Sequence, residues 1–126
     1  MNTGTSLNPL QFHKMYPNGA YMCALEWDSS KIKPSLLTYP TKIIVDCENG
    51  SLVPNCFYHE DKKGTRKRLG YYPHRVSFIS SDIQKVKDYF IADVQKSAAG
   101  RLKWLQDQVD KTDSTAQGLI DKANKL

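Results

Sequence analysis

A dense group of basic side chains lies in the segment YHEDKKGTRKRLGYYPHR, residues 58–75. Lysine and arginine neutralise phosphates, and aromatic rings provide flat surfaces on which nucleic-acid bases stack. The segment therefore predicts contact with an anionic partner, and its mixture of charges and rings favours nucleic acid. The residues assigned to this contact are Lys62, Lys63, Arg66, Lys67, Arg68, Tyr71, Tyr72, His74 and Arg75.

Two other interpretations of these charges stay open. The same side chains would suit an acidic protein surface, or would form a solvated turn whose lysines keep an edge strand from pairing with other chains. No RNP-type, zinc-finger or phosphate-binding glycine motif accompanies them. The segment thus indicates the charge of a partner more firmly than its identity.

Side chains with catalytic or metal-binding potential gather beside the basic segment. His59, Glu60 and Asp61 are consecutive, and Cys56 with His59 has the spacing of half a zinc site. Neighbouring side chains of a strand point to opposite faces, and the chain offers no second pair of ligands. We therefore expect no metal, no cofactor and no enzyme activity.

The chain has three cysteines, Cys23, Cys47 and Cys56, an odd and sparse set that does not indicate a disulfide framework. The Asn-Gly pair at 49–50 predicts a two-residue hairpin turn. In that register Cys47 would face Leu52 and Cys56 would face Ile43, which separates the two thiols by roughly 13 Å along the strands. We expect all three thiols to be free and mostly buried.

Apolar residues from Ile83 to Leu126 recur every three or four positions, which predicts helix. Ser81 and Gln84 form an expected capping box, with Asp82 in the first turn. One long helix and a helical hairpin, broken near Gly100 or within 111–115, both fit this pattern. The first half is expected to cover a sheet.

From Leu102 onward the spacing becomes a heptad register. The a positions are Leu102, Val109, Ala116 and Ala123, and the d positions are Leu105, Thr112, Leu119 and Leu126. This pattern favours self-association or docking to a partner helix. The residues expected at that interface are Leu102, Trp104, Leu105, Val109, Leu119 and Leu126.

The elements that must position these surfaces divide near Ser80. All six prolines lie at or before Pro73, and proline breaks helix interiors, so strands and turns come first. Strands are expected at 20–27, 41–48, 51–58, 64–72 and 74–80. The predicted fold is α+β: a small antiparallel sheet (about 20–80) packed against a long C-terminal helix or helical hairpin (about 82–125). A single domain, 1–126, would comprise an N-terminal arm (1–19), a β-rich part (20–80) and a helical part (81–126).

Composition limits the function classes. The 126 residues carry a formal net charge of +5, with 40% hydrophobic and 25% charged residues, as in ordinary globular domains. No apolar run is long enough for a membrane span, and the N-terminus lacks a secretory pattern, so a cytoplasmic protein is expected. The expected function is binding: the chain self-associates or docks through its C-terminal helix and contacts an anionic partner, most plausibly nucleic acid, through residues 62–75. The alternative is a protein-binding accessory factor, such as an inhibitor or a structural subunit, with no nucleic-acid role.

Overall fold

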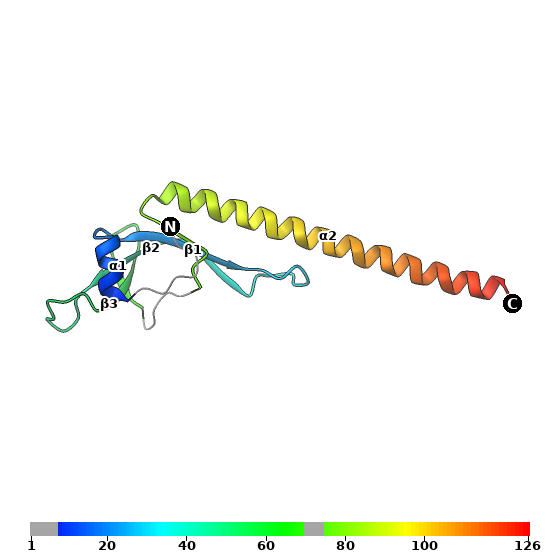
Figure 1. The fold of residues 1–126 in the computed structure, drawn as a ribbon, viewed down its shortest axis with the longest axis horizontal. Coiled ribbons are helices and arrows are strands. Elements are labelled where there is room, and N and C mark those ends of the chain that lie inside the picture. The colour runs from blue at the N-terminus through cyan, green and yellow to red at the C-terminus, as the bar shows by residue number, and fades with distance from the viewer. Residues whose placement is uncertain (1–7, 70–74) are drawn as a thin grey trace.

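The computed structural model describes residues 8–69 and 75–126, and within them the chain forms two helices and a five-stranded antiparallel sheet (Figure 1). The elements are α1 (Pro9–Met15), β1 (Ala20–Glu26), β2 (Leu36–Asp46), β3 (Cys56–Glu60), β4 (Arg66–Arg68), β5 (Phe78–Ser80) and α2 (Ile83–Asn124). The predicted α+β class is confirmed. We call residues 8–82 with their sheet the head.

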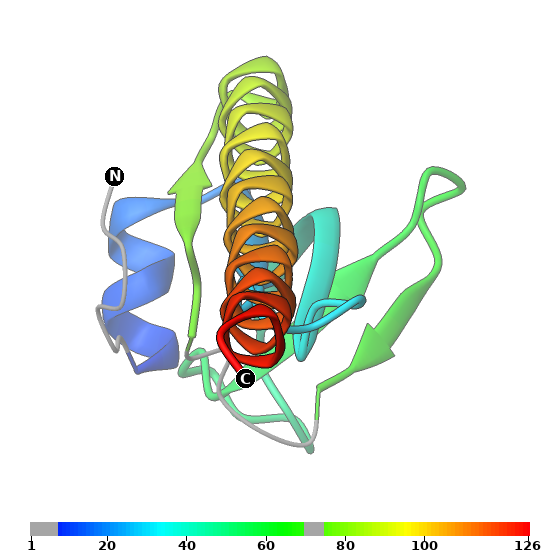
Figure 2. The same cartoon turned by 90° about the vertical axis from the view of Figure 1, so that its right-hand side faces the viewer.

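The strands lie in the order β4-β3-β2-β1-β5. The first four form the expected antiparallel meander, and β5 returns to pair with the free side of β1. The side chains of β1 alternate between the two faces of the sheet. Ala20 and Met22 pack in a cluster with Phe12 of α1, whereas Tyr21 and Cys23 pack against α2. The two helices therefore cover opposite faces, as Figure 2 shows for α1 and α2 on either side of β5.

The expected N-terminal arm contains a helix from residue 9 onward. Asn8 caps α1 by accepting a 2.8 Å hydrogen bond from the Gln11 backbone N–H, and the Gln11 side chain accepts one from the Asn8 N–H. Pro9 occupies the first turn, where its missing N–H costs nothing. Phe12 is 1% exposed and is among the most buried side chains of the head. Within the expected N-terminal arm (1–19), residues 9–15 thus form a helix that packs on the sheet, and residues 1–7 lie outside the described residues.

Strand β2 begins five residues before the predicted strand and passes through Pro40. Met22 pairs with Thr41 and Ala24 with Thr38, so Tyr39 and Pro40 together oppose Cys23. This is a β-bulge, which leaves an unpaired residue on the longer strand and so accommodates a proline without a backbone N–H. Proline at that position gave residues 36–40 the sequence pattern of a turn.

The Asn-Gly turn is present, but the register predicted from it is wrong. Asn49 and Gly50 have positive φ angles of 55° and 75°, as a hairpin turn of this type requires. Strand pairing, however, resumes only at Cys56, which pairs with Asp46 instead of Ile43. Residues 51–55, with Pro54, form a loop that carries no strand. All three cysteines are free, as predicted, although Cys47 is the chain neighbour of the residue that pairs with Cys56.

Helix α2 is one continuous helix, so the helical-hairpin alternative is wrong. Its N-cap is Asp82, one residue later than predicted, which accepts a 2.9 Å hydrogen bond from the Gln84 N–H. Its first half packs on the sheet through Val86, Phe90 and Val94. At 1.5 Å per residue a 42-residue helix is about 63 Å long, and Figure 1 shows it extending well past the head. Among the described residues, no helix is long and apolar enough to cross a membrane.

Candidate interaction surfaces

Residues 58–68 of the basic segment form a hairpin, not a loop. Its tip is a tight turn in which the Asp61 carboxylate accepts hydrogen bonds of 2.9 Å from the backbone N–H groups of Lys63 and Thr65. Gly64 supplies a positive φ of 82°. Lys62 and Lys63 are thereby held exposed at the tip. We call β3, β4 and residues 61–65 the basic hairpin; it lies at the sheet edge farthest from β1 and β5, to the side of α2 (Figure 2).

Two of the predicted contact residues, Arg66 and Arg68, form ion pairs with carboxylates of this chain. Arg66 lies 2.8 Å from Asp46 and 3.1 Å from Glu60, which is itself 3.0 Å from Lys42. Hydrogen bonds from Lys42 and Arg66 hold the pKa of Glu60 below its usual value, so this carboxylate is charged at neutral pH. Arg68 lies 3.1 Å from Glu48. These pairs form a row of alternating charges that runs from β2 and the residues after it, across β3, to β4.

The remaining basic residues differ in their surroundings. Lys62, Lys63 and Lys67 have no carboxylate within ion-pair distance among residues 8–69 and 75–126. Arg75 lies 3.6 Å from Glu26 and adopts a positive φ of 60°. The predicted contacts Tyr71, Tyr72 and His74 lie outside the described residues. The structure thus brings three uncommitted lysines together on one hairpin.

Cys56 and His59, both in β3, do not combine into a metal or nucleophile site. Cys56 is paired with Asp46 and His59 with Ile43, so the two side chains of the supposed zinc half-site belong to opposite faces of β3. The Cys56 thiol donates a 3.0 Å hydrogen bond to Glu48, and this bond, with burial, raises its pKa. In the part of the chain that the structure describes, no three His, Cys, Asp or Glu side chains are grouped to hold a metal ion.

A shallow groove lies between the basic hairpin and the start of α2. Lys42, His59, Glu60, Lys62 and Ile83 contribute to its lining. Lys42 was missed by sequence reasoning because its place beside Glu60 depends on the β2–β3 register, which the Asn-Gly turn alone predicts wrongly. The groove adds one more cation to the same side of the head, although Glu60 offsets it.

The heptad residues of α2 form an uncovered apolar stripe. Leu102 is 67% exposed, Leu105 38%, Val109 51% and Leu119 64%, while Leu126 is wholly exposed. Trp104, the other predicted interface residue, is half-buried. We call the stripe formed by the a and d positions of residues 102–126 the distal stripe. Every large apolar side chain predicted on it is therefore at least one-third accessible to a partner.

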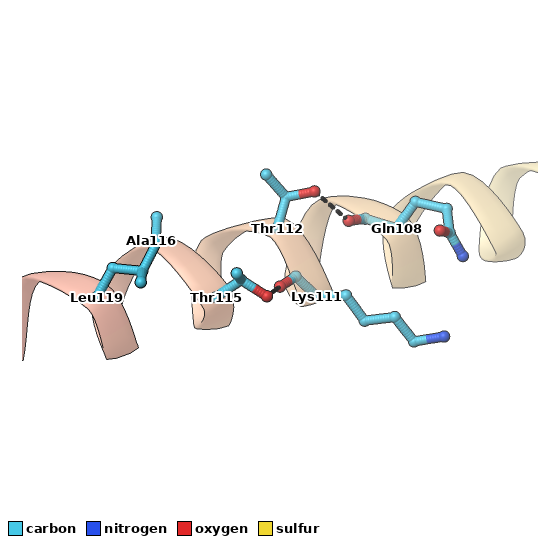
Figure 3. A pocket seen from close by; sticks show the side chains of 6 residues that line it. All are labelled: Gln108, Lys111, Thr112, Thr115, Ala116 and Leu119. Atoms are coloured by element: carbon cyan, nitrogen blue, oxygen red, sulfur yellow. Dashed lines mark hydrogen bonds between the residues drawn. The ribbon is translucent and has the colours of Figure 1, made fainter.

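A surface hollow lies at the middle of the distal stripe (Figure 3). Its lining residues are Gln108, Lys111, Thr112, Thr115, Ala116 and Leu119. The Thr112 hydroxyl donates to the Gln108 carbonyl and the Thr115 hydroxyl to the Lys111 carbonyl, each at 2.9 Å. Because these hydroxyls are satisfied within the helix, the threonines need no hydrogen bond from a partner. Sequence reasoning placed Thr112 and Ala116 in the heptads but missed the hollow. The shape of the surface depends on the side-chain rotamers, which the sequence does not give.

Comparison of the chain with protein-family models, with curated proteins and with solved structures found no significant match.

Proposed function

We propose that this chain is a self-associating binding protein in which the distal stripe of α2 pairs with a second copy and the basic hairpin contacts an anionic partner. The observation that carries the proposal is the stripe itself. Several large apolar side chains lie exposed at heptad spacing on the part of α2 that extends beyond the sheet. Contiguous exposed apolar surface of this kind marks interaction sites.

Charge favours a second copy as the occupant of the stripe. Residues 102–126 contain four lysines and four aspartates, so two such segments have no net charge that would drive them apart. The net charge of +5 belongs to residues 1–101. Pairing through the distal stripe would therefore join the neutral parts and leave the basic heads free.

The anionic partner is inferred from the three lysines without carboxylate partners, Lys62, Lys63 and Lys67. Nucleic acid is the first candidate, since clustered lysines neutralise successive phosphates. A protein partner is the second, because the alternating charges of Arg66, Arg68 and their carboxylates match a mixed protein surface better than a uniformly negative one. In that role the chain would be an accessory or structural subunit.

Self-association is tested by sedimentation of the wild type and of L105K/L119K. The variant should lose association and keep a folded head, because Leu105 and Leu119 have no part in the buried core. The control S114K/N124K adds the same charge on exposed positions outside the heptad seam and should associate like the wild type. A wild type that is monomeric at high concentration would reject this half of the proposal.

The anionic partner is tested by titrating single-stranded and duplex oligonucleotides at several salt concentrations. Replacing Lys62, Lys63 and Lys67 by serine should weaken binding and make the slope of log affinity against log salt shallower by about 0.7–0.9 for each phosphate that is no longer neutralised. The matched control removes three lysines of α2, at 85, 87 and 96. If the wild type binds neither oligonucleotide at low salt, the nucleic-acid role is excluded and the protein-partner candidate replaces it.

A further inference from the structure

The side of α2 that packs on the head continues into the distal stripe. Five turns of an α-helix take about 18 residues, so Thr112 lies in phase with Val94, and Leu119 lies in phase with Arg101. Val94 packs against the sheet, and Arg101 donates a 3.1 Å hydrogen bond to the carbonyl of Ser29 in the head. The head and the exposed stripe therefore lie on the same side of one uninterrupted helix.

This placement restricts how two copies can pair. In a parallel pair the two α2 helices face each other along their whole length. Residues 83–101 of one copy would then have to contact the side of the other copy's helix that its own sheet already covers. The helix has no break near Gly100 at which the two could diverge. Resting on the self-association proposed above, we infer that two copies pair antiparallel through residues 102–126, with the heads at opposite ends of the pair.

The sizes of the stripe residues fit this orientation. With the two segments 102–126 fully overlapped, the facing pairs are Leu102 with Leu126, Leu105 with Ala123, Val109 with Leu119, and Thr112 with Ala116. The pairs are largest at the ends and smallest at the centre, where the two hollows meet. Straight helices that cross at an angle approach most closely at one point, and the small pairs at the centre suit a crossing there.

A parallel, in-register pair would have a different order of sizes. Identical positions would face each other, so Ala116 would meet Ala116, Leu119 would meet Leu119 and Ala123 would meet Ala123. Neighbouring layers would then differ in size by more than in the antiparallel pair, since a Leu–Leu layer would lie between two Ala–Ala layers. Steps of this size leave larger voids between straight helices, and voids forfeit packing contacts.

Disulfide trapping tests the orientation. In the antiparallel pair Leu105 faces Ala123 of the second copy, whereas the two copies of residue 105 lie about 27 Å apart along the axis. A mixture of L105C and A123C chains should therefore give a crosslinked dimer that contains one of each. Each variant alone should crosslink no more than the wild type, whose Cys23 and Cys56 are buried and whose half-buried Cys47 sets the background.

The outcomes distinguish a wrong orientation from a failure of the proposed self-association. A monomeric wild type in sedimentation overturns both. A dimeric wild type in which L105C or A123C crosslinks with itself overturns the antiparallel orientation and leaves self-association intact. Species that grow beyond the dimer with concentration would mean an open, head-to-tail contact, which also overturns the orientation.

A charge variant gives an independent readout in the uncrosslinked protein. Asp113 lies next to the centre of the overlapped segments, so the antiparallel pair brings it beside the same residue of the second copy. D113N should then tighten association several-fold, because it removes a like-charge contact. D110N, at an outward position of the same turn, is the control and should change association little. Equal effects of the two variants would contradict the inferred register.

Discussion

At the scale of single residues, Gly19 shows how closely the head is packed. Its φ is +87°, and an added Cβ would lie 2.6 Å from Ile44 Cγ2 and 2.8 Å from the Ile43 carbonyl oxygen. Gly50 also has a positive φ, of 75°, but has open space around it. The two positions therefore separate backbone strain from steric overlap.

We predict that G19A lowers the free energy of unfolding by about 2–4 kcal/mol, since strain and overpacking each cost about 1–3 kcal/mol. G50A should cost only about 1 kcal/mol, from strain alone. Urea unfolding followed by fluorescence measures both. Equal losses would mean that Gly19 is needed for its backbone angle and not for the approach of β2.

The thiol of Cys23 gives a pH-dependent prediction. Burial raises its pKa from 9.0 to about 11, and the nearby Asp93 carboxylate adds to the rise, while a backbone hydrogen bond with Phe78 opposes it. The fold thus favours the neutral thiol. This contribution to stability is complete below pH 9 and is lost as the pH rises towards about 11.

The C23A variant should consequently lose less stability than the wild type between pH 9 and 11 in paired urea titrations. At about pH 8 the wild-type thiol should react with a thiol reagent much faster in denaturant than in the native state, because the thiolate is the reactive form. Parallel stability curves for the two proteins across this pH range would contradict the burial of Cys23 against α2.

At the scale of elements, the two glycines inside α2 differ in what surrounds them. Gly118 has open space, whereas an added Cβ at Gly100 would lie 3.2 Å from the Ser29 hydroxyl oxygen. Alanine favours helix over glycine by about 1 kcal/mol, so G118A should raise the thermal stability of the helical circular dichroism signal. G100A should gain less, because Ser29 must move. Equal gains would indicate that the turn between β1 and β2 does not rest on α2.

The long helix was the most predictable part of the fold, because its apolar residues recur with a regular period over many turns. The recurrence from Ile83 to Leu126 indicated the ends of the helical region to within a residue or two, but it left open a break near Gly100 that the continuous helix α2 does not have. Helix α1 was missed because seven residues hold too few turns for a period. Its capping residues, Asn8 and Gln11, were the available signal.

Register was the least predictable part, and it decides the candidate surfaces. Pro40 and Pro54 both have the sequence pattern of turns, yet one lies in a bulge and the other in a loop, and the difference depends on contacts with β1. Because the β2–β3 register was unknown, the ion pairs of Arg66 and Arg68 with carboxylates of β2 and β3 and of the residues that follow β2 were not foreseeable. The sequence located the basic side chains, but it could not show which of them form ion pairs with carboxylates of the same chain.

At the scale of the whole molecule, the head and the distal half of α2 should behave independently. The buried apolar residues run from Phe12 to Phe90, so deletion of residues 102–126 removes no core side chain. We predict that the 1–101 fragment unfolds with a free energy within about 0.5 kcal/mol of that of L105K/L119K and remains monomeric. A fragment that fails to fold would show that the distal half supports the head.

The length of α2 also sets the dimensions of the protein in solution. A compact chain of 126 residues has a radius of gyration of about 14 Å, whereas α2 alone is about 63 Å long. X-ray scattering should therefore give a radius well above the compact value for the L105K/L119K monomer. A value near the compact one would contradict the straight, extended helix of Figure 1.

The orientation of α2 gives a single copy of the chain an electric polarity, which cancels in an antiparallel pair. The helix begins at the head, so its partial positive end adds to the charge of the basic residues there, and its partial negative end lies at the far tip. Near a polyanion, attraction of the basic head would turn the head inward and the helix outward. A layer of such molecules on an anionic polymer would resemble a brush, with the apolar stripes held away from the polymer and free to meet those of neighbouring layers.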